Sequence, residues 1–247
     1  VFFLIDFSRS DLNWVLDLVT RVADEGHMDS LALVDTFGVV SPHAMRYFVN
    51  HVQARIDKPL EAHFHQDFGL GVANTIIALA EGVEVAHTTV LGVGERAGNA
   101  PMEELVIALL TMYGIDVGID YSKLYSLAKL VEELSGHRVP TNKPIVGDQL
   151  YQIESGIVTS WLRNVGDEHV TEVFPVHWDL VGQAPGGSAL GKGSGIDSVK
   201  IWLDDIGVEA DDDQAMDVLM AVKQFALENK RLLNQDDLRK IVDEVLT

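Results

Sequence analysis

Residues 60–91, LEAHFHQDFGLGVANTIIALAEGVEVAHTTVL, decide the fold. The apolar run Leu60–His65 is typical of a strand, and the pattern from Gly69 to Gly82 is typical of a helix. A second apolar run, Val83–Leu91, follows at once, so the stretch predicts a strand–helix–strand unit. Such units join parallel strands through right-handed crossovers.

The same unit repeats on both sides of this stretch. Strands are expected at Val1–Ile5 and Leu31–Val34, and helices over Asp11–Glu25, from Ser41 onward and over Pro101–Tyr113. Four βα units fit either a doubly wound sheet or part of a (β/α)8 barrel. No GxGxxG sequence follows a strand, which weakens the dinucleotide-binding version. Polar residues gather instead after several strands, which favours the barrel.

The alternation of strands and helices ends after one more expected helix, Tyr121–Leu134. Gly136–Pro144 has the composition of a linker, and amphipathic acidic helices are expected further on, at Ser198–Ile206, Asp212–Asn229 and from Gln235. The sequence therefore predicts an α/β chain with two parts. Residues 1–140 would form a partial barrel, and residues 141–247 small helical and mixed subdomains.

Composition narrows the class of protein. The chain has 18 Lys and Arg against 38 Asp and Glu, a net charge of −20, so its surface repels phosphate backbones and nucleic acid is not an expected partner. It has no Cys, which excludes disulfides and thiolate chemistry. No apolar run is long enough for a membrane span, and nothing resembles a secretory signal, so a cytoplasmic protein is expected.

His63 and His65 form the strongest candidate metal motif. Residues i and i+2 of a strand point to the same side, about 6.5–7 Å apart, so two imidazoles can hold one cation. Asp67 continues the same alternation. The alternative is that both histidines are ordinary polar residues of a barrel interior.

The glycine-rich segment Gly92–Asn99 strengthens the prediction of a metal site. Its glycines permit close approach of the backbone to a ligand. Glu95, Arg96 and Asn99 would add an acid, a cation and a neutral oxygen donor at the same edge. Taken alone, this segment also fits a tight βα turn with a solvated ion pair.

Together, the stretch His63–Asn74 and the sequence Gly94-Glu95-Arg96-Ala97-Gly98-Asn99 resemble the DRE-TIM metallolyase family, also called HMGL-like or pyruvate carboxyltransferase. Isopropylmalate, homocitrate and citramalate synthases and hydroxymethylglutaryl-CoA lyase belong to that family. Asp35-Thr36-Phe37-Gly38 resembles its preceding strand. The Gly-Glu-Arg-Ala-Gly-Asn form is similar to the condensing synthases, because the lyase carries a cysteine-containing loop.

The resemblance implies the C-terminal half of a TIM barrel, strands five to eight, followed by the family's C-terminal subdomains. It implies a divalent metal (Mg, Mn or Zn), with an α-keto acid and acetyl-CoA as substrates. The unpaired edges of a partial barrel separately predict a homodimer or larger assembly. The implied metal residues are His63, His65 and Asn99, with Thr36 on the keto-acid carboxylate. The loop residues implied to border the acyl-CoA are Gly92, Gly94, Glu95 and Arg96.

Two departures from the family pattern stand out. The family's first strand brings an acidic metal ligand, an arginine and a catalytic glutamate, and none of these has a counterpart here, so the catalytic residues stay unassigned. In addition, Ile153, Val158 and Gly193 replace histidines of the family's subdomains. His169 and His177 lie nearby in sequence and are interpreted as surface histidines.

The predicted function is metal-dependent, Claisen-type condensation of acetyl-CoA with an α-keto acid, in amino-acid biosynthesis. The 247-residue chain is expected to lack this activity by itself. A retro-aldol or retro-Claisen lyase and a catalytically inactive fragment or subunit remain alternatives.

Overall fold

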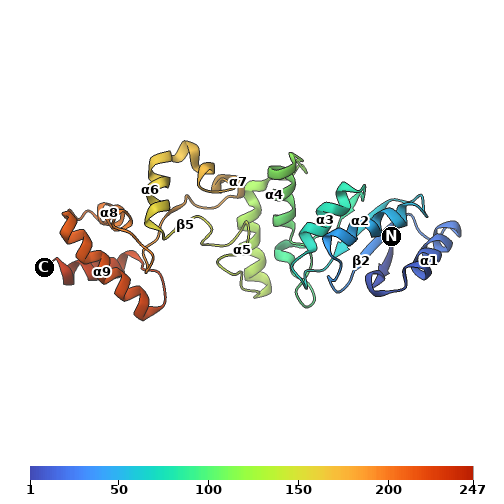
Figure 1. Ribbon diagram of the computed structural model, residues 1–247, viewed down its shortest axis with the longest axis horizontal. Helices are drawn as coiled ribbons and strands as arrows, with labels where there is room; N and C mark the ends of the chain where they lie inside the picture. The colour runs from blue at the N-terminus through green and yellow to red at the C-terminus, as the bar shows by residue number, and fades with distance from the viewer. Residues whose placement is uncertain (247) are drawn as a thin grey trace. The chain divides into compact units, whose positions relative to one another are not determined.

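A computed structural model describes residues 1–246 of the chain, leaving Thr247 aside. The chain divides into two compact units, Val1–Val139 and Pro140–Thr247. Their elements follow one another along the chain as coloured in Figure 1. The assignment of residues 1–140 and 141–247 to separate domains stays a prediction.

The first unit is built on a four-stranded parallel sheet. Its strand order, β1-β2-β3-β4, is the order of the strands in the sequence. A doubly wound sheet needs a reversal of this order, so the sequential arrangement with one helix after each strand is that of a partial barrel. The expected α/β class is confirmed. The strands are β1 Phe2–Ile5, β2 Leu31–Asp35, β3 Leu60–Phe64 and β4 Val85–Ala86.

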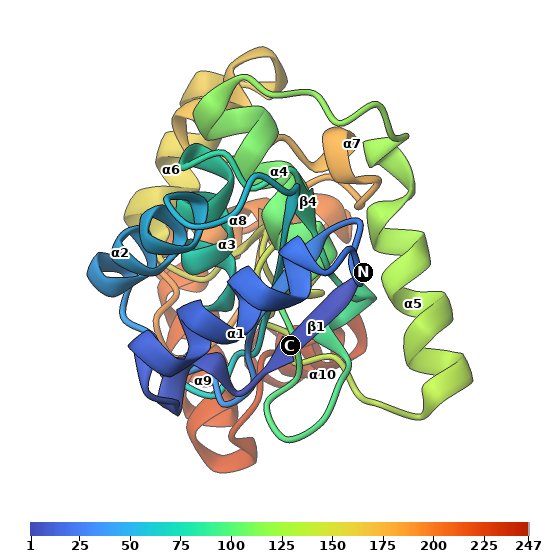
Figure 2. The same ribbon diagram turned by 90° about the vertical axis from the view of Figure 1, so that its right-hand side faces the viewer.

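Helices follow the strands where the sequence predicted them. Asp11 caps the first, accepting a hydrogen bond from the backbone N–H of Trp14, and Ser41 caps the second in the same way, with Pro42 at its first position. Figure 2 presents this unit with β1 and α1 toward the reader. The helices of the unit are α1 Leu12–Asp24, α2 Pro42–Gln53, α3 Gly71–Ala80, α4 Met102–Tyr113 and α5 Leu124–Ser135.

The core of this unit lies between the sheet and its helices. Leu31 and Leu33 of β2 and Phe64 of β3 are fully buried, as are Met45 and Val49 of α2. Every residue of β2 is buried, which is the state of a strand covered on both faces. This packing fixes the register of β2 against β3, in which Val34 pairs with His63 and Asp35 with Phe64.

The fourth strand is shorter than predicted. The apolar run Val83–Leu91 forms a strand only at Val85–Ala86, and Val90–Gly92 is a 3-10 turn in which Leu91 has φ 61°. The chain leaves the sheet there because Thr89 pairs with Pro101 instead, through an isolated bridge. The apolar composition did not reveal this change of partner.

The second unit is mainly helical. Its core gathers Leu190, Val199, Leu203, Val218 and Leu238, each at most 2% exposed. Its strands β5 Gln152–Ile153 and β6 Gly187–Ser188 pair in parallel. Its helices are α6 Gly156–Val165, α7 Trp178–Val181, α8 Ile196–Asp205, α9 Asp212–Asn229 and α10 Gln235–Val245.

None of the helices within residues 1–246 combines the length and the apolar character that a membrane crossing requires.

Candidate metal centre

The polar residues singled out in the sequence lie at one edge of the sheet, just beyond the carboxyl ends of the strands. Thr36 directly follows β2, and His65 directly follows β3. The loop after β4 folds back so that Asn99 pairs with His65 through an isolated antiparallel bridge. The structure therefore brings His65 and Asn99 side by side across 34 residues of sequence.

This pair carries two buried polar atoms that lack hydrogen-bond partners. They are Nδ1 of His65 and Oδ1 of Asn99. An unpaired buried polar atom costs stability, so two of them on neighbouring residues indicate a ligand that satisfies both. Imidazole nitrogen and amide oxygen together suit a divalent cation of borderline softness. The residues present therefore fit the metal that the sequence resemblance implies.

His63 lies next to this pair. Its imidazole is close to those of His65 and His87, so three imidazoles gather here. Its ring centroid is 5.4 Å from that of His65 and 5.5 Å from that of His87. Burial, and then the neighbouring charges of His65 and His87, lower the pKa of His63. A lowered pKa favours the neutral ring, which is the form that binds a metal.

The candidate metal ligands of this centre include no negatively charged side chain. Among the side chains that the structure describes, no three His, Asp or Glu residues are arranged to hold a metal ion. His63, His65 and Asn99 are all neutral ligands, whereas sites for divalent cations ordinarily include a carboxylate.

Asp67 does not supply that carboxylate. Its Oδ1 accepts a hydrogen bond of 2.8 Å from Nε of Arg96, and its Oδ2 one of 3.2 Å from the same guanidinium. This hydrogen bonding lowers the pKa of Asp67 and raises that of Arg96. Asp67 lies three residues beyond the last residue of β3, Phe64, and there it pairs with Arg96.

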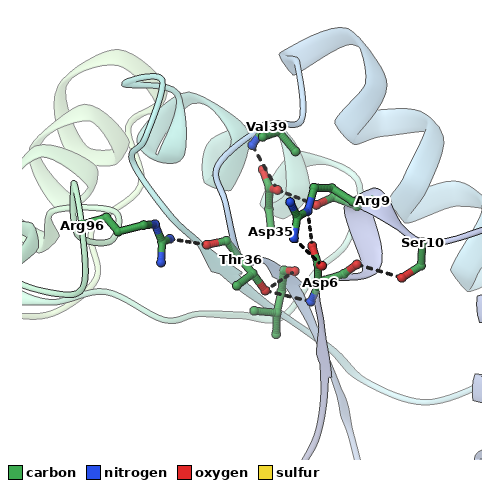
Figure 3. Close-up of polar contacts among 9 residues, drawn as sticks. Asp6, Arg9, Ser10, Asp35, Thr36, Val39 and Arg96 are labelled. Atoms are coloured by element: carbon green, nitrogen blue, oxygen red, sulfur yellow. Dashed lines mark hydrogen bonds and ion pairs between the residues drawn. The ribbon is translucent and has the colours of Figure 1, made fainter.

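Arg96 also ties the glycine-rich loop to the end of β2. Its guanidinium donates to the carbonyl oxygen of Thr36 (Figure 3). The Thr36 hydroxyl accepts a hydrogen bond of 2.8 Å from the backbone N–H of Asp6. The guanidinium groups of Arg9 and Arg96 lie 3.7 Å and 4.9 Å from the centre of the Phe37 ring. Thr36 is thus held by hydrogen bonds from Asp6 and Arg96.

The loop itself is packed tightly against Asn99. A Cβ atom on Gly98, whose φ is +82°, would lie 1.8 Å from the carbonyl oxygen of Gly92. A Cβ atom on Gly94 would lie 2.4 Å from Nδ2 of Asn99. Gly98 requires glycine because the clash is with backbone and its φ is positive, whereas a side chain at Gly94 would displace the Asn99 amide. Glu95, by contrast, extends outward with 89% of its side chain exposed.

The sequence interpretation missed three residues of this region. His87 follows β4 and approaches His63, with 3.3 Å between their Nδ1 atoms. Glu61 accepts a hydrogen bond from His87 at 2.7 Å and one from Ser30 at 2.6 Å. Burial raises the pKa of Glu61, but these two hydrogen bonds outweigh it and leave the pKa below its ordinary value. The only sequence signal was that Glu61 precedes His63 by two residues.

The positions of the family's replaced histidines lie in the second unit. Ile153 is buried in β5, and the backbone N–H of Gly193 donates to Oε1 of Glu154 at 2.6 Å. His177 caps α7 by accepting a hydrogen bond of 3.1 Å from the backbone N–H of Asp179. A structural role is thus shown for His177.

A comparison with family models decides the classification. Residues 1–131 match the HMGL-like model. The chain belongs to the HMGL-like family. This finding confirms the resemblance drawn from the histidine motif and the glycine-rich loop.

Several curated proteins with different names are similar in sequence to this HMGL-like chain. It is 41% identical over 98% of its length to a putative (R)-citramalate synthase of Archaeoglobus fulgidus, of which it covers 48%. It is 33% identical to the 2-isopropylmalate synthase of Methanocaldococcus jannaschii and 37% to a homocitrate synthase of Methanopyrus kandleri, covering 98% of itself in both cases and 46% and 59% of those proteins. The chain thus spans about half the length of the first of these relatives.

Among solved structures, the HMG-CoA lyase of Bacillus subtilis matches with a TM-score of 0.48 and 28% identity, over 54% of this chain and 46% of that one.

Proposed function

We propose that this chain contributes the metal-binding edge of an enzyme that condenses an acyl-CoA, acetyl-CoA first among them, with an α-keto acid. The paired orphan atoms, His65 Nδ1 and Asn99 Oδ1, carry the proposal. The relatives named citramalate, isopropylmalate and homocitrate synthases support the reaction class.

In this proposal His63, His65 and Asn99 hold a divalent cation, Mg, Mn or Zn. When bound, the cation polarises the keto carbonyl and stabilises the negative charge that develops on its oxygen. Thr36, held by Asp6 and Arg96, binds the carboxylate of the keto acid.

The loop residues Gly92, Gly94, Glu95 and Arg96 border the acyl-CoA. Condensation removes a proton from the methyl group of the thioester, forms a carbon–carbon bond to the keto carbon and protonates the keto oxygen. Water then cleaves the thioester and releases the CoA thiol. The group that takes the methyl proton is not assigned to any residue of this chain.

Calorimetric titration with Mn²⁺ and Zn²⁺ tests the cation site. We expect His65→Ala and Asn99→Ala each to weaken binding at least tenfold, whereas His27→Ala, which removes an exposed imidazole beside Glu25, leaves it unchanged. Equal affinity in all four proteins would overturn the proposed site.

A thiol-release assay tests the reaction in the natural protein that carries these residues. Acetyl-CoA is offered with pyruvate, 2-oxoisovalerate, 2-oxoglutarate or glyoxylate, with and without metal. Metal-dependent release of CoA that requires a keto acid supports condensation. Cleavage of a preformed hydroxyacyl-CoA without condensation would favour the lyase instead.

A further inference from the structure

A continuous run of hydrogen bonds leads from Ser30 to His63. The Ser30 hydroxyl donates to Oε1 of Glu61 at 2.6 Å, and Nε2 of His87 lies 2.7 Å from Oε2 of the same carboxylate. Nδ1 of His87 then lies 3.3 Å from Nδ1 of His63. Neither Glu61 nor His87 has a part in the proposed condensation.

The sheet itself holds these side chains together. Glu61 and His63 are two residues apart on β3 and therefore project from the same face. The backbone N–H of His87 donates to the carbonyl oxygen of Ala62 at 2.8 Å, which anchors His87 level with the residue between them. The Phe3 ring lies against both imidazoles, 6.0 Å from His63 and 5.5 Å from His87 between ring centroids.

With both imidazoles neutral, these contacts allow one assignment of protons. The Glu61 carboxylate is an acceptor, so Nε2 of His87 carries the proton that it donates. Nδ1 of a neutral His87 is then an acceptor, and Nδ1 of His63 must be the donor. The remaining nitrogen of His63, Nε2, is left with a free lone pair.

We propose that Glu61 and His87 are positioning residues that hold the proton of His63 on Nδ1 and present its Nε2 to the divalent cation. The inference rests on the proposed cation site. A carboxylate that orients a histidine ligand is a common device in metal sites, where it fixes ring orientation and tautomer. Here the Glu61 carboxylate orients His63 indirectly, through the imidazole of His87.

Nitrogen-15 NMR of the histidine rings tests the tautomer in the metal-free chain. We expect His63 to be in the Nδ1–H form, and His87→Ala to shift it toward the Nε2–H form. His87→Asn should preserve the Nδ1–H form, because its amide oxygen can accept the same hydrogen bond. Replacing a side chain of purely structural importance would not move this signal selectively.

Titration with Zn²⁺ or Mn²⁺ measures the consequence for the cation. Loss of such an outer partner typically weakens metal binding about 10–100-fold, which we expect for His87→Ala and Glu61→Ala. Glu61→Gln and His87→Asn should retain most of the affinity, and Ser30→Ala should have the smallest effect. His27→Ala is the matched control, since it disrupts another His–Glu pair, with 3.4 Å between His27 Nε2 and Glu25 Oε2.

Two results would overturn the inference. One is an unchanged His63 tautomer in His87→Ala. The other is a Zn²⁺-induced shift of the His87 Nδ1 resonance like that of a coordinated nitrogen, which would make His87 a ligand. If His63→Ala leaves metal binding unchanged, the proposed cation site fails, whereas the tautomer measurement in the metal-free chain still decides the role of His87.

Discussion

At the scale of single residues, Gly94 controls where the Asn99 side chain can lie. A Cβ atom there would meet Nδ2 of Asn99 at 2.4 Å, so Gly94→Ala should displace the amide that carries the orphan oxygen. We expect a loss of Mn²⁺ affinity of roughly tenfold, about 1.4 kcal/mol, with little change in melting temperature. Calorimetric titration and thermal unfolding measure the two effects.

Gly187→Ala is the matched control for this substitution. Gly187 has open space around its Cβ position and no positive φ, so neither stability nor affinity should change. A Gly94→Ala protein that binds Mn²⁺ as tightly as the original would show that Asn99 is not a ligand.

The Asp35 carboxylate holds the turn that follows β2. Asp35 is fully buried, and its carboxylate accepts hydrogen bonds from Ser8 Oγ at 2.7 Å and Val40 N at 3.0 Å. It also accepts one of 3.2 Å from Val39 N (Figure 3). Asp35→Asn places an amide donor against these donors. We expect a destabilisation of about 1–3 kcal/mol in urea unfolding, because buried donors lose their acceptor.

Ser8→Ala removes only one of the three donors and leaves the carboxylate in place. Its expected cost is about 0.5–1.5 kcal/mol. If Asp35→Asn proved no more costly than Ser8→Ala, the turn after β2 would not depend on this carboxylate.

At the scale of elements, the N-terminus of α10 links stability to pH. Hydrogen bonds from Arg231, at 2.6 Å and 2.9 Å, lower the pKa of Asp237 from 3.8 to about 2. Because the folded state binds this proton more weakly than the unfolded state, the stabilisation is complete above pH 3.8 and is lost as pH falls toward 2. We expect it to amount to about 1–2 kcal/mol, allowing for solvent around Arg231.

Urea unfolding of Asp237→Asn against the original chain checks this value. The difference should be largest at pH 7 and should shrink as the pH falls below 3.8. Asp236→Asn is the control, since Asp236 is an exposed residue of the same helical turn. A difference that stays constant down to pH 2.5 would exclude the linkage.

At the scale of the whole molecule, the exposed edge of the sheet predicts self-association. Among the described strands β1 pairs only with β2, and its Phe3 and Ile5 are 45% and 70% exposed. An open, apolar strand edge is a template for pairing with another chain. We expect dimers or larger assemblies at tens of micromolar, measured by light scattering.

Charge sets the conditions for this association. The net charge of −20 opposes it at low salt, so raising the salt concentration to about 0.15 M should promote it by screening. Ile5→Lys should shift the chain toward monomer, whereas Leu134→Lys, which changes an exposed residue of α5, should not. A stable monomer at all these concentrations would contradict the prediction.

The sequence alone determined the order of strands and helices, because hydrophobic periodicity and capping residues are local signals. It also determined that His63 and His65 share one face, since the period of a strand is two. The tight glycine loop was readable because only glycine tolerates such close approach. Local apolar composition did not reveal that β4 ends at Ala86.

Only the tertiary structure decided which partners meet. Asp67 lies beside Arg96, 29 residues away, rather than beside the histidines, and His87 reaches His63 from the next strand. Asn99 meets His65 through a bridge between separate loops. These contacts depend on the register of neighbouring strands and on where each strand ends. Side-chain packing in three dimensions sets both, and no local pattern of the chain encodes them.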